Sequence, residues 1–260
     1  MGDRVTMTMT DGVADVRLAR PDKMNALDPA MFDGIVAALA ELEAMQGLRA
    51  VVLSGAGRAF CAGLDVASFA GGLTGGLDAR PYGPANIFQH VALGWRALPV
   101  PVIAAVHGVA FGGGFQIMLG ADIRIAAPDS RLSIMEIKWG LVPDMAGVAL
   151  LRTLVRDDVA RDLTYSGRQF DAAEAAALGV VTRLAGDPHA EALALARAIA
   201  GRSPDAVRAA KRLFNAAPDQ DLATILRAES AEQAALIGAP NQREAVLANV
   251  EKRTPCFTTP

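Results

Sequence analysis

The sequence predicts a mixed α/β core followed by a helical C-terminal region. Short apolar runs such as residues 50–53 and 101–106 end in glycine-containing loops, which is typical of strands buried on both faces. Segments with helical spacing of apolar residues lie between these runs, and beyond about residue 200 every apolar pattern has helical spacing. We therefore expect an α/β core over residues 1–200 and a helical region over residues 201–260.

The first half of the chain alternates between strand and helix signals. Two alternating stretches on either side of Asp11-Gly12 predict a hairpin over residues 5–18. Asp28 followed by Pro29 predicts the start of a helix that reaches Gly47. The further elements expected here are a strand at 50–53, a glycine-rich surface loop at 71–83, a helix at 87–98, a strand at 101–106, a buried helix at 115–119, and strands at 122–126 and 131–134.

The second half is mainly helical in pattern. One short strand is expected at residues 179–181, where Gly179 precedes two valines. Ser203-Pro204 predicts another helix start. The expected helices cover 148–154, 159–164, 172–178, 191–200, 204–214, 222–237 and 243–252.

Composition excludes several classes of protein. The 260 residues contain 25 Lys+Arg and 28 Asp+Glu, a balance of −3 that argues against a nucleic-acid binder which neutralises phosphates. No apolar run approaches the ~18 residues of a membrane span, and the first ten residues do not resemble a signal peptide, so a soluble cytoplasmic protein is expected. Cys61, Cys256 and three scattered histidines have neither metal-ligand spacing nor a disulfide pattern, so no metal site is expected.

Two glycine-containing loops follow two of the predicted buried strands. Neither has the spacing of a phosphate-binding loop or of a dinucleotide fingerprint. Gly112-Gly113-Gly114 comes at a strand-to-helix junction, where unpaired N–H groups can bind an oxyanion. The alternative is a tight turn that needs glycine only for its backbone geometry. Residues 58–65 follow the preceding strand in the same way, so the two junctions can face one carbonyl oxygen.

Four motifs occur in a fixed order and cover nearly the whole chain. They are Arg20-Pro21 with Lys23 and Asn25-Ala26-Leu27; residues 59–65; His107-Gly108 through Gly112-Gly113-Gly114; and residues 251–257, Glu-Lys-Arg-Thr-Pro-Cys-Phe. Each motif is weak alone, but in this order they resemble the crotonase superfamily, also called the enoyl-CoA hydratase/isomerase family. The resemblance implies a spiral core of ββα units and a C-terminal helical region that builds homotrimers, often paired into homohexamers.

The resemblance also implies an acyl-CoA thioester substrate and no cofactor beyond the coenzyme A that the substrate carries. The backbone N–H groups of Leu64 and Gly113 would hold the thioester oxygen. The coenzyme A would be lined by Lys23, Ala26, Ala62, Gly63 and Asp65, with Lys252 and Phe257 reaching it from a neighbouring subunit. The wall of the acyl pocket is expected between residues 68 and 90.

The candidate acid–base residues depart from those of the family's hydratases. Those enzymes bind the reacting water molecule with two glutamates. One lies two residues after the glycine run and the other lies 20 residues later. The corresponding residues here are Gln116 and Glu136. Glu136 is the expected catalytic residue, whereas Gln116 can form hydrogen bonds but cannot exchange a proton. The alternatives are a surface or capping role for Glu136 and a role for Gln116 in holding the loop.

A further acid, Asp144, lies eight residues after Glu136, where the hydratases usually carry glycine. The family's dienoyl-CoA isomerases have a glutamate and an aspartate at these two positions, and its 4-chlorobenzoyl-CoA dehalogenases have the aspartate but a tryptophan in place of Glu136. The sequence therefore favours an isomerase in which Glu136 removes a proton and Asp144 returns one. The alternatives are a 2-enoyl-CoA hydratase, a non-catalytic acyl-CoA-binding relative, and a turn-shaping role for Asp144 after Pro143.

Overall fold

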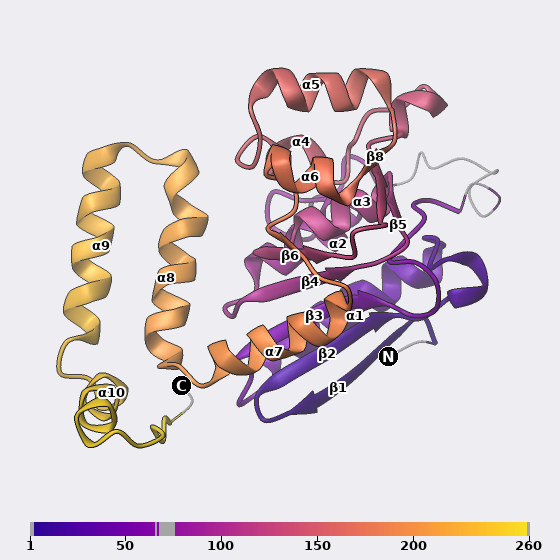
Figure 1. Ribbon diagram of the computed structural model, residues 1–260. Coiled ribbons are helices and arrows are strands. Elements are labelled where there is room, and N and C mark those ends of the chain that lie inside the picture. Colours follow the sequence, from indigo (N-terminus) through magenta and orange to yellow (C-terminus); the bar gives the residue numbers. More distant parts are fainter. Residues whose placement is uncertain (1–2, 66, 68–75, 259–260) are drawn as a thin grey trace.

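Two β-sheets form the centre of the molecule. The computed structural model describes residues 3–65, 67 and 76–258. One sheet has six strands in the order β1-β2-β3-β4-β6-β9, and the other has three in the order β5-β7-β8 (Figure 1). The strands are β1 (Val5–Thr10), β2 (Val13–Leu18), β3 (Ala50–Gly55), β4 (Val102–Val106), β5 (Val109–Phe111), β6 (Ile123–Ala126), β7 (Arg131–Ser133), β8 (Phe170–Asp171) and β9 (Arg183–Leu184).

Helices cover the sheets and continue into the C-terminal region. The short 3-10 helices are η1 (Pro21–Lys23), η3 (Glu136–Trp139) and η4 (Ala217–Asp219). The α-helices of the core are α1 (Pro29–Ala44), α2 (Ile87–Ala97), α3 (Gly113–Leu119), α4 (Gly147–Leu151), α5 (Asp157–Ser166), α6 (Ala172–Leu178) and α7 (Pro188–Ala200). Those of the C-terminal region are α8 (Pro204–Ala216), α9 (Leu222–Leu236) and α10 (Pro240–Glu251).

The predicted hairpin and the first helix start are confirmed. Strands β1 and β2 pair antiparallel, and Asp11 and Gly12 between them both have positive φ, 51° and 80°. Two consecutive residues with positive φ make the turn that matches the twist of a hairpin. The carboxylate of Asp28 accepts a hydrogen bond of 2.8 Å from the N–H of Met31 and so caps α1. These are local features, which explains why the sequence predicts them.

The interior strands β3 and β4 of the larger sheet are buried on both faces. Strands β2, β3, β4 and β6 run parallel, so their carboxyl ends lie at one edge of the sheet. Val51 and Leu53 of β3 belong to the main apolar cluster together with residues of α1 and α2. Val52, between them, belongs to a second cluster with residues of α7. This double burial confirms the interpretation of residues 50–53 and 101–106 as interior strands.

One predicted strand is wrong. Residues 179–181 form no strand, because the N–H groups of Val180 and Val181 both donate to the carbonyl of Ala175 and close the end of α6. The chain joins the sheet only afterwards, where Arg183 and Leu184 pair with β6. The valines are buried through packing and not through sheet pairing. Strands β5 and β8 of the small sheet are additions that the sequence did not predict.

Part of the predicted glycine-rich loop, residues 71–75, lies outside the described residues. The same holds for residues 68–75 of the expected acyl-pocket wall.

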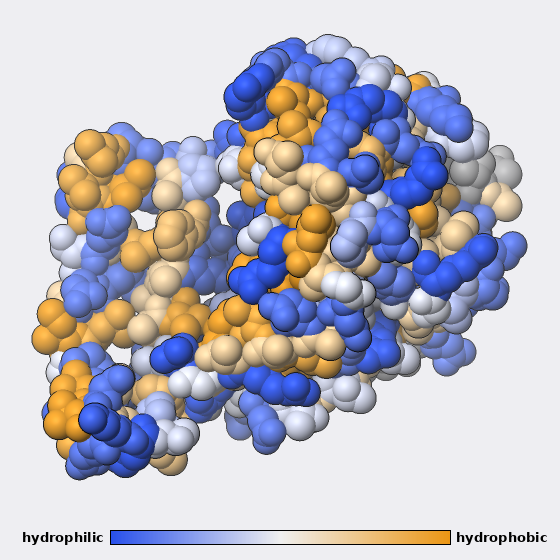
Figure 2. Space-filling model, in the orientation of Figure 1, coloured by the Kyte–Doolittle hydropathy of each residue, from blue (hydrophilic) through white to orange (hydrophobic). Residues whose placement is uncertain are grey.

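The C-terminal helices lie to one side of the sheets (Figure 1). Buried Lys211 of α8 attaches this region to the core, because its Nζ lies 2.7 Å from both Asp122 Oδ2 and the carbonyl oxygen of Val100. Helices α8 to α10 also carry exposed apolar side chains, and Figure 2 shows such surface on these helices. The most exposed are Phe214 (78%), Val250 (74%) and Leu222 (71%). Among the described residues, no helix is both long and apolar enough to cross a membrane.

Candidate active site

The two predicted loops lie against each other at the carboxyl edge of the larger sheet. The N–H of Cys61 donates to Val109, and the N–H of Phe111 donates to Cys61, each over 3.0 Å. The approach of the backbones depends on glycine: a Cβ on Gly63 would lie 2.6 Å from the oxygen of Phe111, and a Cβ on Gly114 would lie 2.4 Å from the oxygen of Cys61. The glycines therefore permit a contact between loops, which goes beyond the tight-turn alternative.

Two backbone donors meet at this contact. Leu27 donates to the oxygen of Gly63 over 2.8 Å, and Asp65 donates to the oxygen of Leu27 over 2.9 Å. These hydrogen bonds involve the residues on either side of Leu64. The N–H of Leu64 itself donates to no backbone group in the described part of the chain. Gly113 is the first residue of α3, so its N–H has no intrahelical acceptor. Within the described residues, the two N–H groups predicted as an oxyanion hole are thus without a backbone acceptor, one on the Leu64 loop and the other at the start of α3.

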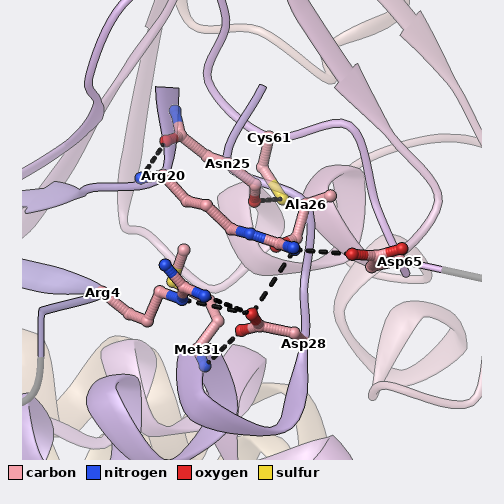
Figure 3. Close-up of polar contacts among 8 residues, drawn as sticks. All are labelled: Arg4, Arg20, Asn25, Ala26, Asp28, Met31, Cys61 and Asp65. Atoms are coloured by element: carbon pink, nitrogen blue, oxygen red, sulfur yellow. Dashed lines mark hydrogen bonds and ion pairs between the residues drawn. The ribbon is translucent and has the colours of Figure 1, made fainter. Parts of the chain in front are cut away.

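Arg20 holds the Leu64 loop to the segment after β2 (Figure 3). Its Nη1 lies 2.8 Å from Asp65 Oδ2 and 3.5 Å from Asp28 Oδ2, and it also donates to the carbonyl of Ala26 over 3.1 Å. Arg4 binds the same oxygen of Asp28 over 2.8 Å. The carboxylate of Asp65, a predicted coenzyme A contact, therefore has a structural partner that fixes the loop.

Asn25 is a second clamp on the same loop. Its Nδ2 lies within hydrogen-bond distance of three carbonyl oxygens, those of Ala56 (2.9 Å), Ala59 (2.8 Å) and Phe60 (3.2 Å). Its Oδ1 accepts from the N–H of Arg20 over 2.8 Å. Sequence reasoning recognised Asn25 and Arg20 only as members of a motif and gave them no role. The three carbonyl groups that accept from Asn25 lie 31 to 35 residues further along the chain, so spacing alone offered no signal for this role.

Gln116 and Glu136 are in direct contact. Gln116 Nε2 donates to Glu136 Oε1 over 2.6 Å, and both side chains are buried, Glu136 being 7% exposed. The N–H of Gly147 donates to Gln116 Oε1 over 2.9 Å. A backbone N–H can only donate, so the atom of the Gln116 amide that faces Gly147 must be its oxygen. The NH₂ group of Gln116 therefore faces Glu136. The orientation of the amide is thereby fixed.

This contact leaves one oxygen of Glu136 available. Among the described residues, Glu136 Oε2 is buried and has no hydrogen-bond partner. Burial raises the pKa of the Glu136 carboxyl, the hydrogen bond from Gln116 opposes that rise, and the negative charge of Asp144 adds to it. A buried carboxylate oxygen without a partner and with a raised pKa has the properties of a general base.

Asp144 lies close enough to Glu136 for their charges to interact, as the effect on the Glu136 pKa indicates. Asp144 as a residue is exposed, yet the protein around its carboxyl still raises its pKa by desolvation. It follows Pro143 between η3 and α4, and its N–H donates to Val142 over 2.9 Å. The structure thus places the second predicted acid within electrostatic range of the first.

The predicted coenzyme A residues fall into two groups. Lys23 is exposed on η1, and Ala62 lies beside it in space, since the N–H of Ala62 donates to Met24 over 2.9 Å. Lys252 and Phe257 lie instead at the end of the C-terminal region. The oxygen of Phe257 accepts from Arg49, which precedes β3 and so lies at the opposite edge of the sheet from the Leu64 loop. Within one chain they do not join the site.

Cys61 is not a nucleophile in this site. It is fully buried, and its Sγ donates to the oxygen of Asn25 over 3.1 Å. Burial raises the pKa of its thiol to about 12. The thiol is therefore protonated at neutral pH, and Cys61 serves as a small packing residue between the two loops. The described residues also contain no group of three or more side chains placed to hold a metal ion.

The chain is similar to known proteins over nearly its whole length. The family model for enoyl-CoA hydratase/isomerase matches residues 8–260. The crystal structure of enoyl-CoA hydratase from Bacillus anthracis has a TM-score of 0.89 and 30% identity, and the match covers 98% of both chains. Methylglutaconyl-CoA hydratase of Mus musculus is 31% identical, covering 95% of this chain and 79% of the relative. Delta(3,5)-Delta(2,4)-dienoyl-CoA isomerase of Dictyostelium discoideum is 28% identical, covering 94% and 87%.

Proposed function

The chain belongs to the enoyl-CoA hydratase/isomerase family, with the crotonase fold, and we propose that it moves a carbon–carbon double bond in an unsaturated acyl-CoA thioester. One observation carries this proposal. The hydrogen bond from Gln116 occupies one oxygen of Glu136 and leaves Oε2 as a single buried base, with Asp144 as a second acid nearby. One base and one separate acid suit a proton moved from one carbon to another.

In the proposed reaction, Glu136 Oε2 takes the proton from the carbon next to the thioester carbonyl. The electron pair of that C–H bond delocalises onto the thioester oxygen, which accepts hydrogen bonds from the N–H groups of Leu64 and Gly113. In comparable sites, loss of one such donor costs about 3–4 kcal/mol of transition-state stabilisation. Asp144, whose carboxyl has a pKa raised by desolvation, is proposed to donate a proton to a carbon further along the chain, so that the double bond shifts. Proton exchange with solvent then returns Glu136 to its base form and Asp144 to its acid form.

The coenzyme A part of the substrate is proposed to lie along Lys23, Ala26 and residues 62–65, beside the two N–H groups. Lys252 and Phe257 would contribute from a neighbouring copy, because in their own chain they lie at the other edge of the sheet. We propose a homotrimer or a pair of trimers, supported by the exposed apolar side chains of α8 to α10. Size-exclusion chromatography with light scattering gives the molar mass and tests this assembly. The mass of a monomer at micromolar concentration would contradict it.

Hydration of a 2-enoyl thioester is the second candidate, and the names of the relatives favour it, since several are hydratases. Glu136 Oε2 could hold a water, but Gln116 cannot supply a proton to it. The two reactions differ in their products. We would incubate the protein with 3-enoyl-, 3,5-dienoyl- and 2-enoyl-CoA in heavy water and follow ultraviolet absorbance and deuterium uptake. A conjugated product from 3-enoyl- or 3,5-dienoyl-CoA supports isomerisation. Hydration of 2-enoyl-CoA with no isomerisation of the other two would contradict the proposal and favour a hydratase.

A further inference from the structure

Two buried side chains pack against Gly113, the residue at the start of α3 whose N–H is one of the two proposed donors to the thioester oxygen. A Cβ on Gly113 would lie 2.8 Å from Met145 Sδ and 2.9 Å from Leu27 Cδ1. Met145 is 2% exposed, Leu27 is fully buried, and both belong to the main apolar cluster. These two residues thus fill the space in which a side chain of Gly113 would begin.

A hydrogen bond sets the direction of the Gly113 N–H group. The carbonyl oxygen of Gly112, which belongs to the same peptide unit, accepts from the N–H of Gln116 over 3.0 Å. The C=O and N–H groups of a trans peptide point in opposite directions, so the N–H of Gly113 points out of the N-terminal end of α3. The neighbouring glycines contribute no side chain to the packing here. The residues packed against Gly113 therefore set how far its N–H lies from a bound thioester.

Leu27 and Met145 come from different parts of the site. The backbone of Leu27 pairs with the residues on either side of Leu64, which carries the other proposed donor. Met145 directly follows Asp144, ahead of α4. One contact on Gly113 therefore comes from the segment that holds the other donor, and the second comes from the segment that carries the proposed acid.

The turn that carries Met145 is itself held in place. Ala146 has a φ of 63°, a left-handed conformation that a non-glycine residue keeps only where its surroundings impose it. The N–H of Gly147 donates to Gln116 Oε1 over 2.9 Å, and a Cβ on Gly147 would lie 2.5 Å from that oxygen. Met145 is thus packed against Gly113 from a turn that is anchored on Gln116.

We propose that Met145 is a positioning residue, which holds the N–H of Gly113 at its working distance from the thioester oxygen and couples this donor to the segment of Asp144. The inference rests on the proposed function, which places the thioester oxygen at the N–H groups of Leu64 and Gly113. An N–H···O hydrogen bond spans only about 2.7–3.2 Å, and a misplacement of about 1 Å can cost about a hundredfold in rate. A void beside Gly113 should lower kcat more than it weakens binding, because this hydrogen bond strengthens as charge develops on the oxygen.

Infrared spectroscopy tests the proposal on a ligand that the proposed reaction does not convert. The probe is butyryl-CoA labelled with ¹³C at the thioester carbonyl, whose stretching band moves to lower wavenumber when the oxygen accepts hydrogen bonds. Met145→Ala opens a void beside Gly113, Met145→Val opens a smaller one, and Met145→Leu nearly keeps the volume. Met31→Ala is the matched control, because Met31 is also buried in the main apolar cluster but lies on α1. Calorimetry would give Kd for butyryl-CoA, and circular dichroism with thermal melting would verify that each variant is folded.

The band of the bound probe is expected at lower wavenumber than in water for the wild-type protein, Met145→Leu and Met31→Ala. In Met145→Ala it should move part of the way back, because the donor of Leu64 remains, and Met145→Val should lie between. For isomerisation, kcat should fall about tenfold or more in Met145→Ala and less than about threefold in Met145→Leu, while Kd for butyryl-CoA changes less than about threefold.

The inference would be overturned by a band that stays unmoved in folded Met145→Ala or Met145→Val, or by an equal displacement in Met31→Ala. A wild-type band at its position in water would overturn it as well. If no thioester is isomerised while the band depends on Met145 as expected, the proposed reaction fails and the positioning role stands.

Discussion

Replacing Gln116 by Met should move the acidic limb of the pH–rate profile to higher pH. The NH₂ group of Gln116 donates to Glu136 Oε1 over 2.6 Å and so stabilises the ionised carboxylate. A hydrogen bond to a charged group contributes about 1.5–3 kcal/mol, and about 1.4 kcal/mol corresponds to one pH unit. Its loss should therefore raise the pKa of Glu136 further, by about one to two pH units. Since the base must be ionised to take a proton, activity should begin to rise only at that higher pH.

The assay is kcat/KM for isomerisation between about pH 4 and pH 9, because this parameter reports the ionisation of the free enzyme. Gln220→Met is the matched control, since Gln220 is exposed on the surface after η4. It should leave the limb in place. The reasoning would be refuted if Gln116→Met left the limb unmoved or shifted it to lower pH while the variant remained folded and active at its plateau.

Three further substitutions test neighbouring parts of the account. Asp144→Asn removes the proposed proton donor, so kcat for isomerisation should fall by about a hundredfold or more while deuterium uptake next to the thioester persists; an unchanged kcat would contradict this role. Glu136→Gln should raise the melting temperature at neutral pH, because a carboxyl with a raised folded-state pKa lowers stability as pH rises through that value; an equal gain at pH 4 would contradict this origin. Asn25→Ala should lower the free energy of unfolding by about 3 kcal/mol in urea titrations, because buried carbonyl groups lose their donor; a loss below about 0.5 kcal/mol would show that the clamp is dispensable.

The sequence predicted those parts of the fold whose causes are local. The Asp11-Gly12 turn and the Asp28 cap each depend on neighbours within three residues, and both are confirmed. The strand expected at residues 179–181 does not form, because the backbone N–H groups of its two valines are hydrogen-bonded to α6. Their side chains are buried as in a strand, but their N–H groups close α6 by donating to the carbonyl of Ala175. This cap around Gly179 is local, and the apolar pattern of the valines was given more weight than the glycine signal for a helix end.

The candidate site divides in the same way. The order of motifs was sufficient to predict Leu64, Gly113 and Glu136 as candidates, because each has a fixed place in a motif that contains glycine or follows one, and their roles stay predictions. The orientation of Gln116 was not predictable, since it depends on a donor at Gly147, 31 residues further along the chain. The clamp from Arg20 to Asp65 and the contact of Met145 with Gly113 also arise from segments that only the fold brings together.

The central claim is that Glu136 Oε2 takes the proton next to the thioester. Its most direct test is exchange of that proton with solvent, measured by mass spectrometry when a 3-enoyl-CoA is incubated in heavy water with the wild-type protein or with Glu136→Gln. The account predicts rapid deuterium uptake at this carbon for the wild type and a loss of at least about a hundredfold for Glu136→Gln. Equal uptake by the two proteins, with both folded, would contradict the account.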